Sequence, residues 1–183
     1  DGLNKISTST RTGYYMRKLL REDVNLDPTG TNTQKHVIPR IRYTEIYLAY
    51  AEAANEAWGP DGSGVYGFSA REVIGMIRGR AGITQPDAYL ASIPSGDAGK
   101  AEMRQLIHNE RRLELCFEGF RFWDLRRWKE PLNESAKGMR IVNNAYTPIN
   151  NLEIRAYDDN MYYGPIPYSE VQKFDQLQQN RGW

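Results

Sequence analysis

Several residue types and motifs that serve common chemistries are scarce or missing in this sequence. It has a single cysteine, Cys116, so no disulfide can form within the chain. Its two histidines, His36 and His108, lie far apart and have no cysteine or acidic partner at metal-ligand spacing. The chain also has no phosphate-cradling glycine-rich motif and no GxSxG nucleophile motif. We therefore expect neither a metal nor a cofactor.

Two further absences concern partners. No apolar run approaches the length of about 18 residues that indicates a transmembrane helix, so no segment is expected to span a membrane. Charge of neither sign predominates, because 24 Lys and Arg face 23 Asp and Glu. This balance predicts no nucleic-acid footprint.

A length of 183 residues favours one domain with a sizeable core.

The beginning of the sequence has no Met and no signal peptide. Residues 1–13, DGLNKISTSTRTG, have a loop-like composition that is typical of the middle of a longer protein. The expectation is a fragment or a processed product.

A dense run of glutamate, arginine and large aromatics lies between Glu110 and Trp128, ERRLELCFEGFRFWDLRRW. At helical spacing, Glu110 and Glu114 share one face with Met103, Leu106, Ile107, Leu113 and Phe117. A buried carboxylate needs a cation or hydrogen-bond donors to persist. Nearby arginines favour structural ion pairs between helices. We assign this signature to Glu110, Arg111, Arg112, Glu114, Glu118, Arg121 and Asp124.

The alternative for the same carboxylates is catalysis. Carboxyls one helical turn apart can be about 5 to 9 Å apart, the range that glycoside hydrolases use. Such enzymes usually need one carboxylate in an open cleft, whereas this pair is surrounded by Leu113, Phe117 and Phe120. We expect no catalytic residue, and a glycoside hydrolase using Glu110 and Glu114 stays an alternative.

The periodicity predicts a mainly helical fold. A first helix is expected over about 41–58, and a second begins after Ser69, which forms a capping-box pair with Glu72, and ends near Gly82. The two should pack as an antiparallel hairpin whose tip is the loop 58–68. Its shared contacts are expected at Tyr47, Ala51, Ile74 and Ile77, and the first helix's apolar stripe at Tyr43, Tyr47, Tyr50, Ala51, Ala54 and Trp58.

Further helices and strands are expected outside this pair. A third helix is expected over about 98–118, broken by Gly119, before a short fourth helix through Trp128. Strand-like runs at 139–142 and 152–155 predict a small hairpin, and 13–18 an ordered strand. We expect residues 1–183 to form a single unit with an irregular lead-in (1–38), a helical core (39–128) and a loop-rich region (129–183).

Aromatic side chains outside the helical stripes are the main candidates for ligand contact. The chain has 12 Tyr, 5 Phe and 4 Trp. Flat rings beside Asn, Asp and Arg suit carbohydrates, whose pyranose faces are apolar and whose rims are hydroxylated. Loop tyrosines also serve as ordinary packing. The candidate ligand-binding residues are Trp58, Tyr66, Tyr89, Tyr146 and Tyr157.

The run that starts at Glu110 resembles the signature of the SusD/RagB family of outer-membrane nutrient-binding lipoproteins, whose pattern is close to ERRxELxFEGxRxxDLRR. Further segments agree with that family in the same order: PRIRY at 39–43 leading into EIYLAYAEAANE at 45–56, IRGRAG at 77–82, and GPIPYSE at 164–170 with QNRGW at 179–183. One departure is Arg181, where the family commonly has proline.

The resemblance implies the C-terminal portion of a SusD-like protein, with tetratricopeptide-like helix pairs and long irregular loops. It implies a non-catalytic surface protein that captures glycans, or less often peptides, for a TonB-dependent SusC-like transporter. Membrane attachment would use a lipidated N-terminus that this sequence does not contain. No binding residue transfers by motif. A helical-repeat scaffold that binds only proteins is a third reading.

Overall fold

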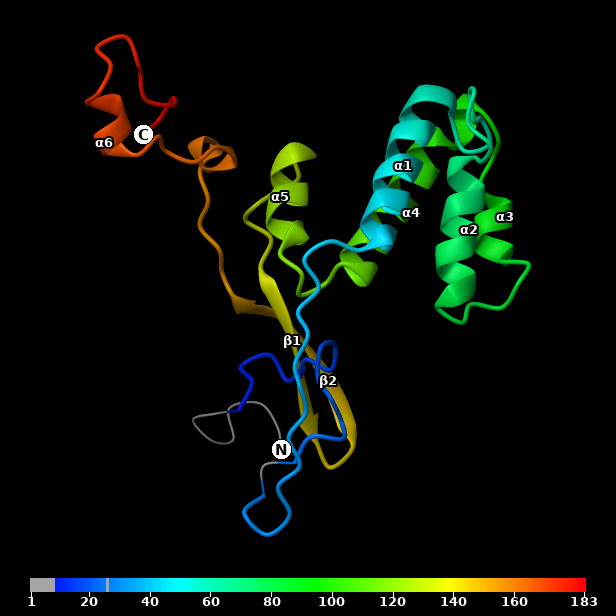
Figure 1. The fold of residues 1–183 in the computed structure, drawn as a ribbon, viewed down its shortest axis with the longest axis vertical. Helices are drawn as coiled ribbons and strands as arrows, with labels where there is room; N and C mark the ends of the chain where they lie inside the picture. The colour runs from blue at the N-terminus through cyan, green and yellow to red at the C-terminus, as the bar shows by residue number, and fades with distance from the viewer. Residues whose placement is uncertain (1–8, 26) are drawn as a thin grey trace. The chain divides into compact units, whose positions relative to one another are not determined.

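The computed structural model describes residues 9–25 and 27–183 (Figure 1). The chain divides into two compact units. We call Val37–Arg121 the helical unit, and Phe122–Trp183 together with the described residues up to His36 the hairpin unit. The expectation that residues 1–183 form one unit with three regions stays a prediction.

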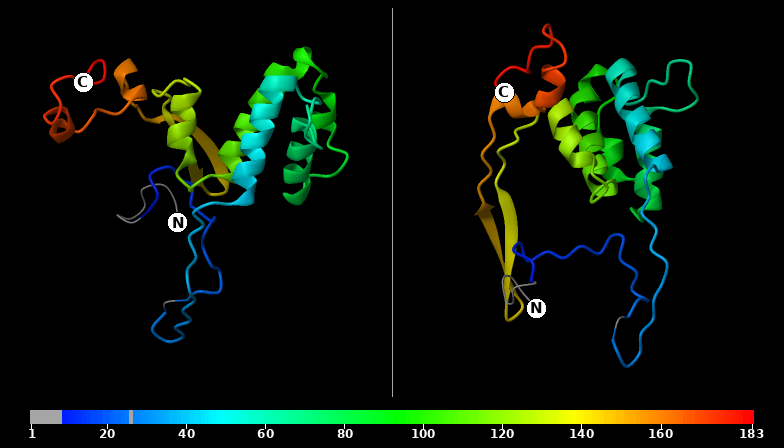
Figure 2. Two further views of the ribbon diagram at one scale, coloured as in Figure 1. Left: turned by 45° about the horizontal axis from the view of Figure 1, so that its top comes forward. Right: turned by 60° about the vertical axis from the view of Figure 1, so that its left-hand side comes forward.

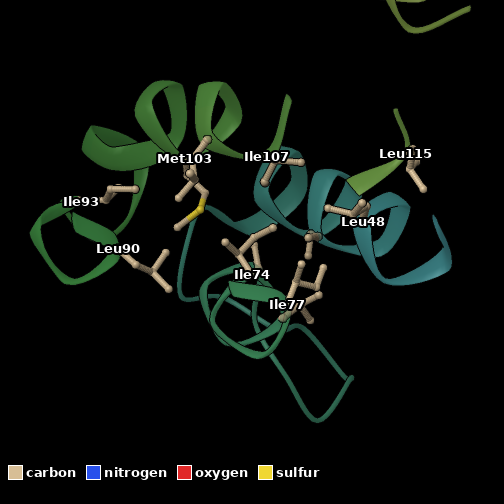
Figure 3. Packing of buried hydrophobic residues seen from close by; sticks show 13 residues of the cluster. Leu48, Ile74, Ile77, Leu90, Ile93, Met103, Ile107 and Leu115 are labelled. Atoms are coloured by element: carbon tan, nitrogen blue, oxygen red, sulfur yellow. The ribbon is translucent and has the colours of Figure 1, made fainter. Parts of the chain in front are cut away.

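The helical unit contains α1 (Tyr43–Trp58), α2 (Ala70–Arg80), α3 (Ala88–Ser92) and α4 (Asp97–Glu114). Helix α1 packs against both α2 and α4, which leaves it central in the bundle (Figures 1 and 2). Figure 3 shows the core of this unit, where side chains from all four helices and the segments that follow α3 and α4 meet. The labelled members are Leu48, Ile74, Ile77, Leu90, Ile93, Met103, Ile107 and Leu115.

Helix α2 begins where the sequence predicts, because its capping box forms. The Ser69 hydroxyl accepts a hydrogen bond from the Glu72 backbone N–H at 3.3 Å, and the Glu72 carboxylate accepts one from the Ser69 N–H at 2.7 Å. These bonds satisfy two backbone donors that a bare helix start leaves unpaired. Gly82, with φ of 91°, follows the helix end. The predicted packing of α1 on α2 is confirmed, and Ala51, Ile74 and Ile77 share one core.

The buried face of α1 differs from the predicted stripe. Its buried residues are Thr44, Leu48, Ala51, Ala54 and Asn55. Tyr43 is 81% exposed, Tyr47 38% and Trp58 42%, so their assignment to the core stripe was wrong. The observed buried face is shifted by about one residue from the predicted one. Small and aliphatic side chains let α2 and α4 approach closely, whereas tyrosine tolerates water at its hydroxyl end.

Helix α4 ends earlier than predicted, at Glu114 instead of near residue 118. The chain then turns, and Phe117 takes a φ of 63° before Gly119 takes 88°. Leu113 and Phe117 are 58% and 64% exposed, so their predicted place on the core face was wrong. Leu115 is buried in their stead, because the turn redirects the side chains that follow the last helical residue. The short helix α5 (Phe120–Arg127) follows as predicted and crosses into the hairpin unit.

The hairpin unit is built on antiparallel strands β1 (Ala136–Val142) and β2 (Ala145–Glu153). The turn between them is Asn143 and Asn144, with φ of 49° and 62°, as a type I′ hairpin requires. A hairpin is present as predicted, but its second strand was misplaced: β2 spans 145–153 instead of 152–155, and residues 139–142 pair with 145–148. A 3-10 helix, η1 (Asp159–Tyr162), and α6 (Tyr168–Val171) complete the unit.

Residues 13–18, predicted as a strand, form none. The Thr12 carbonyl accepts a hydrogen bond from the Met139 N–H at 2.8 Å, but the chain leaves β1 after this single bond. A strand there would need a continued ladder, and most of this segment is exposed. Across the described residues, each helix is too short or too polar to cross a membrane.

Candidate functional site

The acidic side chains of the signature run meet arginines from other segments. Arg78 on α2 lies between Glu110 on α4 and Asp87, and it donates to Glu110 Oε1 at 2.6 Å and to Asp87 Oδ2. The three side chains are 13%, 6% and 4% exposed, in that order. Asp87 also caps α3 by accepting from the backbone N–H groups of Tyr89 and Leu90, both at 3.1 Å. One guanidinium thus connects three helices.

These contacts account for the acidity of Asp87. The hydrogen bond from Arg78 lowers the pKa of Asp87 below its ordinary value, and the backbone donors and the nearby positive charge act in the same direction. Burial opposes this shift, but the donors outweigh it. The charged form of Asp87 is therefore the one that the fold stabilises.

The next two carboxylates along the signature differ in environment. Glu118, whose side chain is 4% exposed, accepts two bonds from Arg42, at 2.9 and 2.8 Å. Arg42 also donates to the Glu114 backbone carbonyl at 2.6 Å, which ties the start of α1 to the end of α4. The Glu114 carboxylate accepts from Arg80 at 2.6 Å, yet the Arg80 side chain is 57% exposed. Solvent screens such a pair, so Glu114 contributes less than Glu118.

The rest of the signature is distributed between the two units. Arg111 is buried, with its guanidinium 5.9 Å from the Phe120 ring centroid, and Arg112 is exposed. Arg121 is half-buried. Asp124, in the hairpin unit, is buried and accepts from Arg127 at 2.8 Å. Among residues 9–25 and 27–183, no group of three or more His, Cys, Asp or Glu side chains is placed to hold a metal ion.

An exposed aromatic cluster lies at the tip of the α1–α2 pair. The ring of Trp58 lies 5.8 Å from that of Tyr66, centroid to centroid, and Tyr66 meets Tyr50 edge-on at 5.9 Å. Tyr50 in turn donates its hydroxyl to the Phe68 carbonyl at 2.7 Å. Trp58 and Tyr66 are 42% and 55% exposed. Two predicted ligand-binding residues thus stand side by side and face water.

Glycines let the loop fold onto the Trp58 indole. A Cβ at Gly64 would lie 2.6 Å from Cζ2 of that ring, and Gly64 has a φ of 55°. Only glycine combines this close approach with that backbone conformation at low cost. The loop is anchored by Asp61, which accepts from Arg71 at 2.6 Å, and this bond lowers the pKa of Asp61.

The other predicted ligand-binding residues do not join this cluster. Tyr89 on α3 is 48% exposed and Tyr146 on β2 is 67% exposed. Tyr157 belongs to the hairpin unit, where it lines a cavity of about 320 Å³ between α5 and the segment that includes η1. The structure therefore brings together Trp58 and Tyr66 only.

The sequence reasoning missed most of the cavity's lining. The aromatic side chains of α5 and the last residue of the chain line it, and these are Phe122, Trp123 and Trp183. Phe122 and Trp123 lie inside the signature run, which was interpreted as structural, and Trp183 ends the QNRGW segment, which was used only as a family match. The available signal was the paired aromatics of FRFW, which an eight-residue helix has little room to bury on one face.

Polar side chains hold the GPIPYSE segment (164–170) and the QNRGW segment (179–183) together in the hairpin unit. The Gln179 amide donates to the Ile166 carbonyl at 2.8 Å and accepts from the Ile166 N–H at 2.7 Å. This exchange imitates the pairing of two strands. Asn180 adds a bond to the Gly164 carbonyl at 2.7 Å. The GPIPYSE and QNRGW segments therefore lie side by side.

A helical unit with buried Arg–Glu pairs, joined to a hairpin unit with long irregular segments, defines a mainly α class of protein. The model of the SusD family matches residues 1–183, and the chain belongs to that family. It is 30% identical over 158 residues to SusD-like protein P25 of Formosa agariphila, covering 86% of this chain and 26% of that protein. It is 34% identical over 122 residues to SusD-like protein P38 of the same organism, covering 66% of this chain and 21% of that protein.

A solved structure agrees with these relatives. The crystal structure of a SusD-like protein from Bacteroides fragilis aligns with 78% of this chain and 25% of its own, at 33% identity and a TM-score of 0.58. The predicted SusD-like, mainly helical fold is thus confirmed. The chain spans about a quarter of the length of the relatives it matches.

Proposed function

We propose that this chain is part of a non-catalytic protein that binds nutrients, and that it contributes a glycan-binding surface through Trp58 and Tyr66. Membership of the SusD family supports a nutrient-binding role. The observation on which the glycan reading rests is the exposed pair of rings at the tip of α1–α2, 5.8 Å apart. Two neighbouring rings offer a platform on which apolar pyranose faces stack.

The loop around this pair is suited to recognition. Its backbone is set by Gly64 and by the Asp61–Arg71 pair, so both rings are held before a ligand arrives. Preorganised aromatic anchors lose little conformational freedom on binding. Besides Asp61, which is paired with Arg71, the loop carries the hydroxyls of Ser63 and Tyr66, which can exchange hydrogen bonds with sugar hydroxyls.

Membership of the family also supports a proposal for the partners and the location of the complete protein. We propose that it is a surface-exposed lipoprotein of the outer membrane that delivers its ligand to a TonB-dependent SusC-like transporter. Peptide in place of glycan is the alternative within the same family. Either nutrient would need an exposed binding surface, and the aromatic cluster provides one.

The absence of catalysis is part of this proposal. Glu110 and Glu114 both accept hydrogen bonds from arginines at 2.6 Å, which suits structural ion pairs. A general acid of a glycoside hydrolase must reach the oxygen of the scissile bond, whereas these two carboxylates are held by guanidinium groups of neighbouring helices. The hydrolase reading predicts that Glu114→Gln abolishes sugar release.

The test is calorimetry of the complete protein with oligosaccharides chosen from a glycan array. Trp58→Ala and Tyr66→Ala should each weaken binding by about 1 to 3 kcal/mol. Tyr168→Ala serves as the matched control, because this tyrosine is 74% exposed and lies in the other unit. Equal affinities for all four proteins would refute the assigned surface. A parallel assay for new reducing ends tests the hydrolase, and a peptide library tests the alternative ligand.

A further inference from the structure

A second aromatic site lies within the hairpin unit, apart from the Trp58 cluster. Its cavity of about 320 Å³ is at the small end of the range of ligand pockets, about 300 to 1,000 Å³, and has room for a group the size of one sugar ring. Helix α5 and the segment with η1, which flank the cavity, lie next to each other in Figure 2. The lining that matters here is Phe122, Trp123, Arg126, Tyr157, Tyr163 and Trp183.

Hydrogen bonds fix the walls of this cavity. The Trp183 indole N–H lies 3.1 Å from both the Asn160 and the Tyr163 carbonyl oxygens, and it donates to them. The Asn160 amide donates to the Gly182 carbonyl at 2.9 Å. Lys129 donates to the Tyr163 hydroxyl at 2.9 Å. These side chains are held in place without any ligand.

Arg126 gives the cavity a positive charge. Its guanidinium lies 3.5 Å from the Phe122 ring centroid and 5.9 Å from that of Tyr157, and it donates to the Phe122 carbonyl at 3.0 Å. Stacking uses the flat face of a guanidinium and leaves N–H groups at its edge for an oxyanion. Within the part of the chain that the structure describes, Arg126 forms no ion pair, and the cavity lining includes no Asp or Glu side chain.

The acidic residues nearest in sequence to the lining residues do not line this cavity. Asp124 is buried and pairs with Arg127. Asp158 and Asp159 line two neighbouring cavities, and Lys129 lines one of these with them. Lys129 lies 4.6 Å from the ring centroid of Tyr163, so a second cation stands beside the tyrosine wall. A ligand that satisfies both the rings and Arg126 must combine an apolar face with an anionic group.

We propose that this cavity binds one anionic sugar unit, whose ring stacks on the aromatic walls and whose carboxylate or sulfate pairs with Arg126. The inference rests on the proposed function and narrows its ligand class to acidic glycans. Guanidinium and oxyanion match in a planar, two-bond geometry, which explains why arginine is suited to the position. A neutral sugar would occupy the rings but leave the arginine unpaired.

The experiment uses the complete protein and measures binding by calorimetry. The probes are glucuronate, glucose 6-sulfate and glucose. Wild type should bind at least one acidic probe about tenfold or more tightly than glucose, as expected when a charge-assisted hydrogen bond is added. The two acidic probes separate carboxylate from sulfate recognition. Equal affinity for all three probes would overturn the proposal.

Variants assign the effect to the cavity. Arg126→Gln should lose the preference for the acidic probe, whereas Arg112→Gln, at an exposed arginine of α4, should keep it. Arg126→Lys retains the charge but not the fork and should show an intermediate preference. An unchanged preference in Arg126→Gln refutes the assignment. If that variant does not fold, as judged by circular dichroism, the wild-type preference and the Arg126→Lys result decide.

The two proposals fail in different ways. Neutral glycan binding that depends on Trp58, without any preference for acidic probes, removes this inference and keeps the proposed function. A wild-type protein that binds no sugar of any kind removes both. Acidic-probe binding that survives Trp58→Ala but not Arg126→Gln supports a second, separate site.

Discussion

The two units of this chain are stabilised by different interactions. All thirteen members of the buried apolar cluster belong to the helical unit, whereas Leu132 is the buried apolar side chain recorded for the described residues of the hairpin unit. The hairpin unit depends on bonds from side chains to backbone, such as those of Gln179 and Asn160. Its aromatic side chains are consequently left at the surface, where they line cavities. A motif of large rings does not therefore indicate a core by itself.

The largest expected effect tests the helical unit's dependence on buried charge pairs. Glu110→Ala leaves Arg78 with Asp87 as its remaining partner but removes the acceptor of its Nη1 group, and it should lower the free energy of unfolding by about 2 to 3 kcal/mol. Urea or thermal unfolding of the chain measures it. Glu114→Ala is the matched comparison and should cost less, because Arg80 in its ion pair is 57% exposed and solvent screens that pair. Similar losses in both variants would contradict this ranking.

The second prediction applies to the hairpin unit. Gln179→Ala removes both bonds to Ile166 and should cost about 1 to 3 kcal/mol, concentrated in that unit. Hydrogen exchange at the Ile166 amide should quicken, since that N–H loses its acceptor. Gln178→Ala, at the exposed neighbouring residue, provides the control and should change neither quantity. Unaltered exchange at Ile166 in Gln179→Ala would show that the amide does not hold the two segments together.

The sequence predicted the elements whose signals are local. The capping box of Ser69 and Glu72, the pairing of α1 with α2 and the presence of a hairpin depend on residues close together in the chain, and each is confirmed. The prediction of which face of α1 is buried was wrong by about one residue. Periodicity alone treats Tyr47 and Leu48 alike, whereas the close approach of neighbouring helices selects Leu48.

Contacts between residues far apart in the chain could not be predicted from residue types. Arg78 pairs with Glu110 across 32 positions, and several other arginines would have satisfied the same carboxylate. The end of α4 is set by the turn through Phe117, a residue type that rarely takes a positive φ. The aromatic cavity needs residues of α5, of the segment after β2 and of the QNRGW motif together. Among the five predicted ligand-binding residues, Trp58 and Tyr66 are the pair close enough in sequence for their contact to be predictable.

A third prediction concerns the loop that supports the aromatic cluster. Gly64→Ala should cost about 1 to 2 kcal/mol, because an L-residue must adopt a left-handed conformation and its methyl group meets the Trp58 ring. Gly67→Ala is the control, since nothing lies within 4 Å of its added Cβ. Thermal unfolding and Trp58 fluorescence report the two consequences. Identical behaviour of both alanine variants would mean that the loop repacks freely around the indole.

Asp87→Asn should cost less at neutral pH than Glu110→Ala, because asparagine still caps α3 through its side-chain oxygen and Arg78 keeps Glu110 as its partner. The fold lowers the pKa of Asp87, so the stability from its charged form is complete above the ordinary value of about 3.9 and is lost as pH falls through the lower folded pKa. The difference in unfolding free energy between wild type and Asp87→Asn should stay constant above about pH 5 and shrink below about pH 4. Glu56 and Asp61 also have lowered pKa values, and comparing the two proteins cancels their contribution. Urea unfolding at a series of pH values measures the difference, and a difference that stays constant down to acid unfolding would exclude Asp87 as the titrating group.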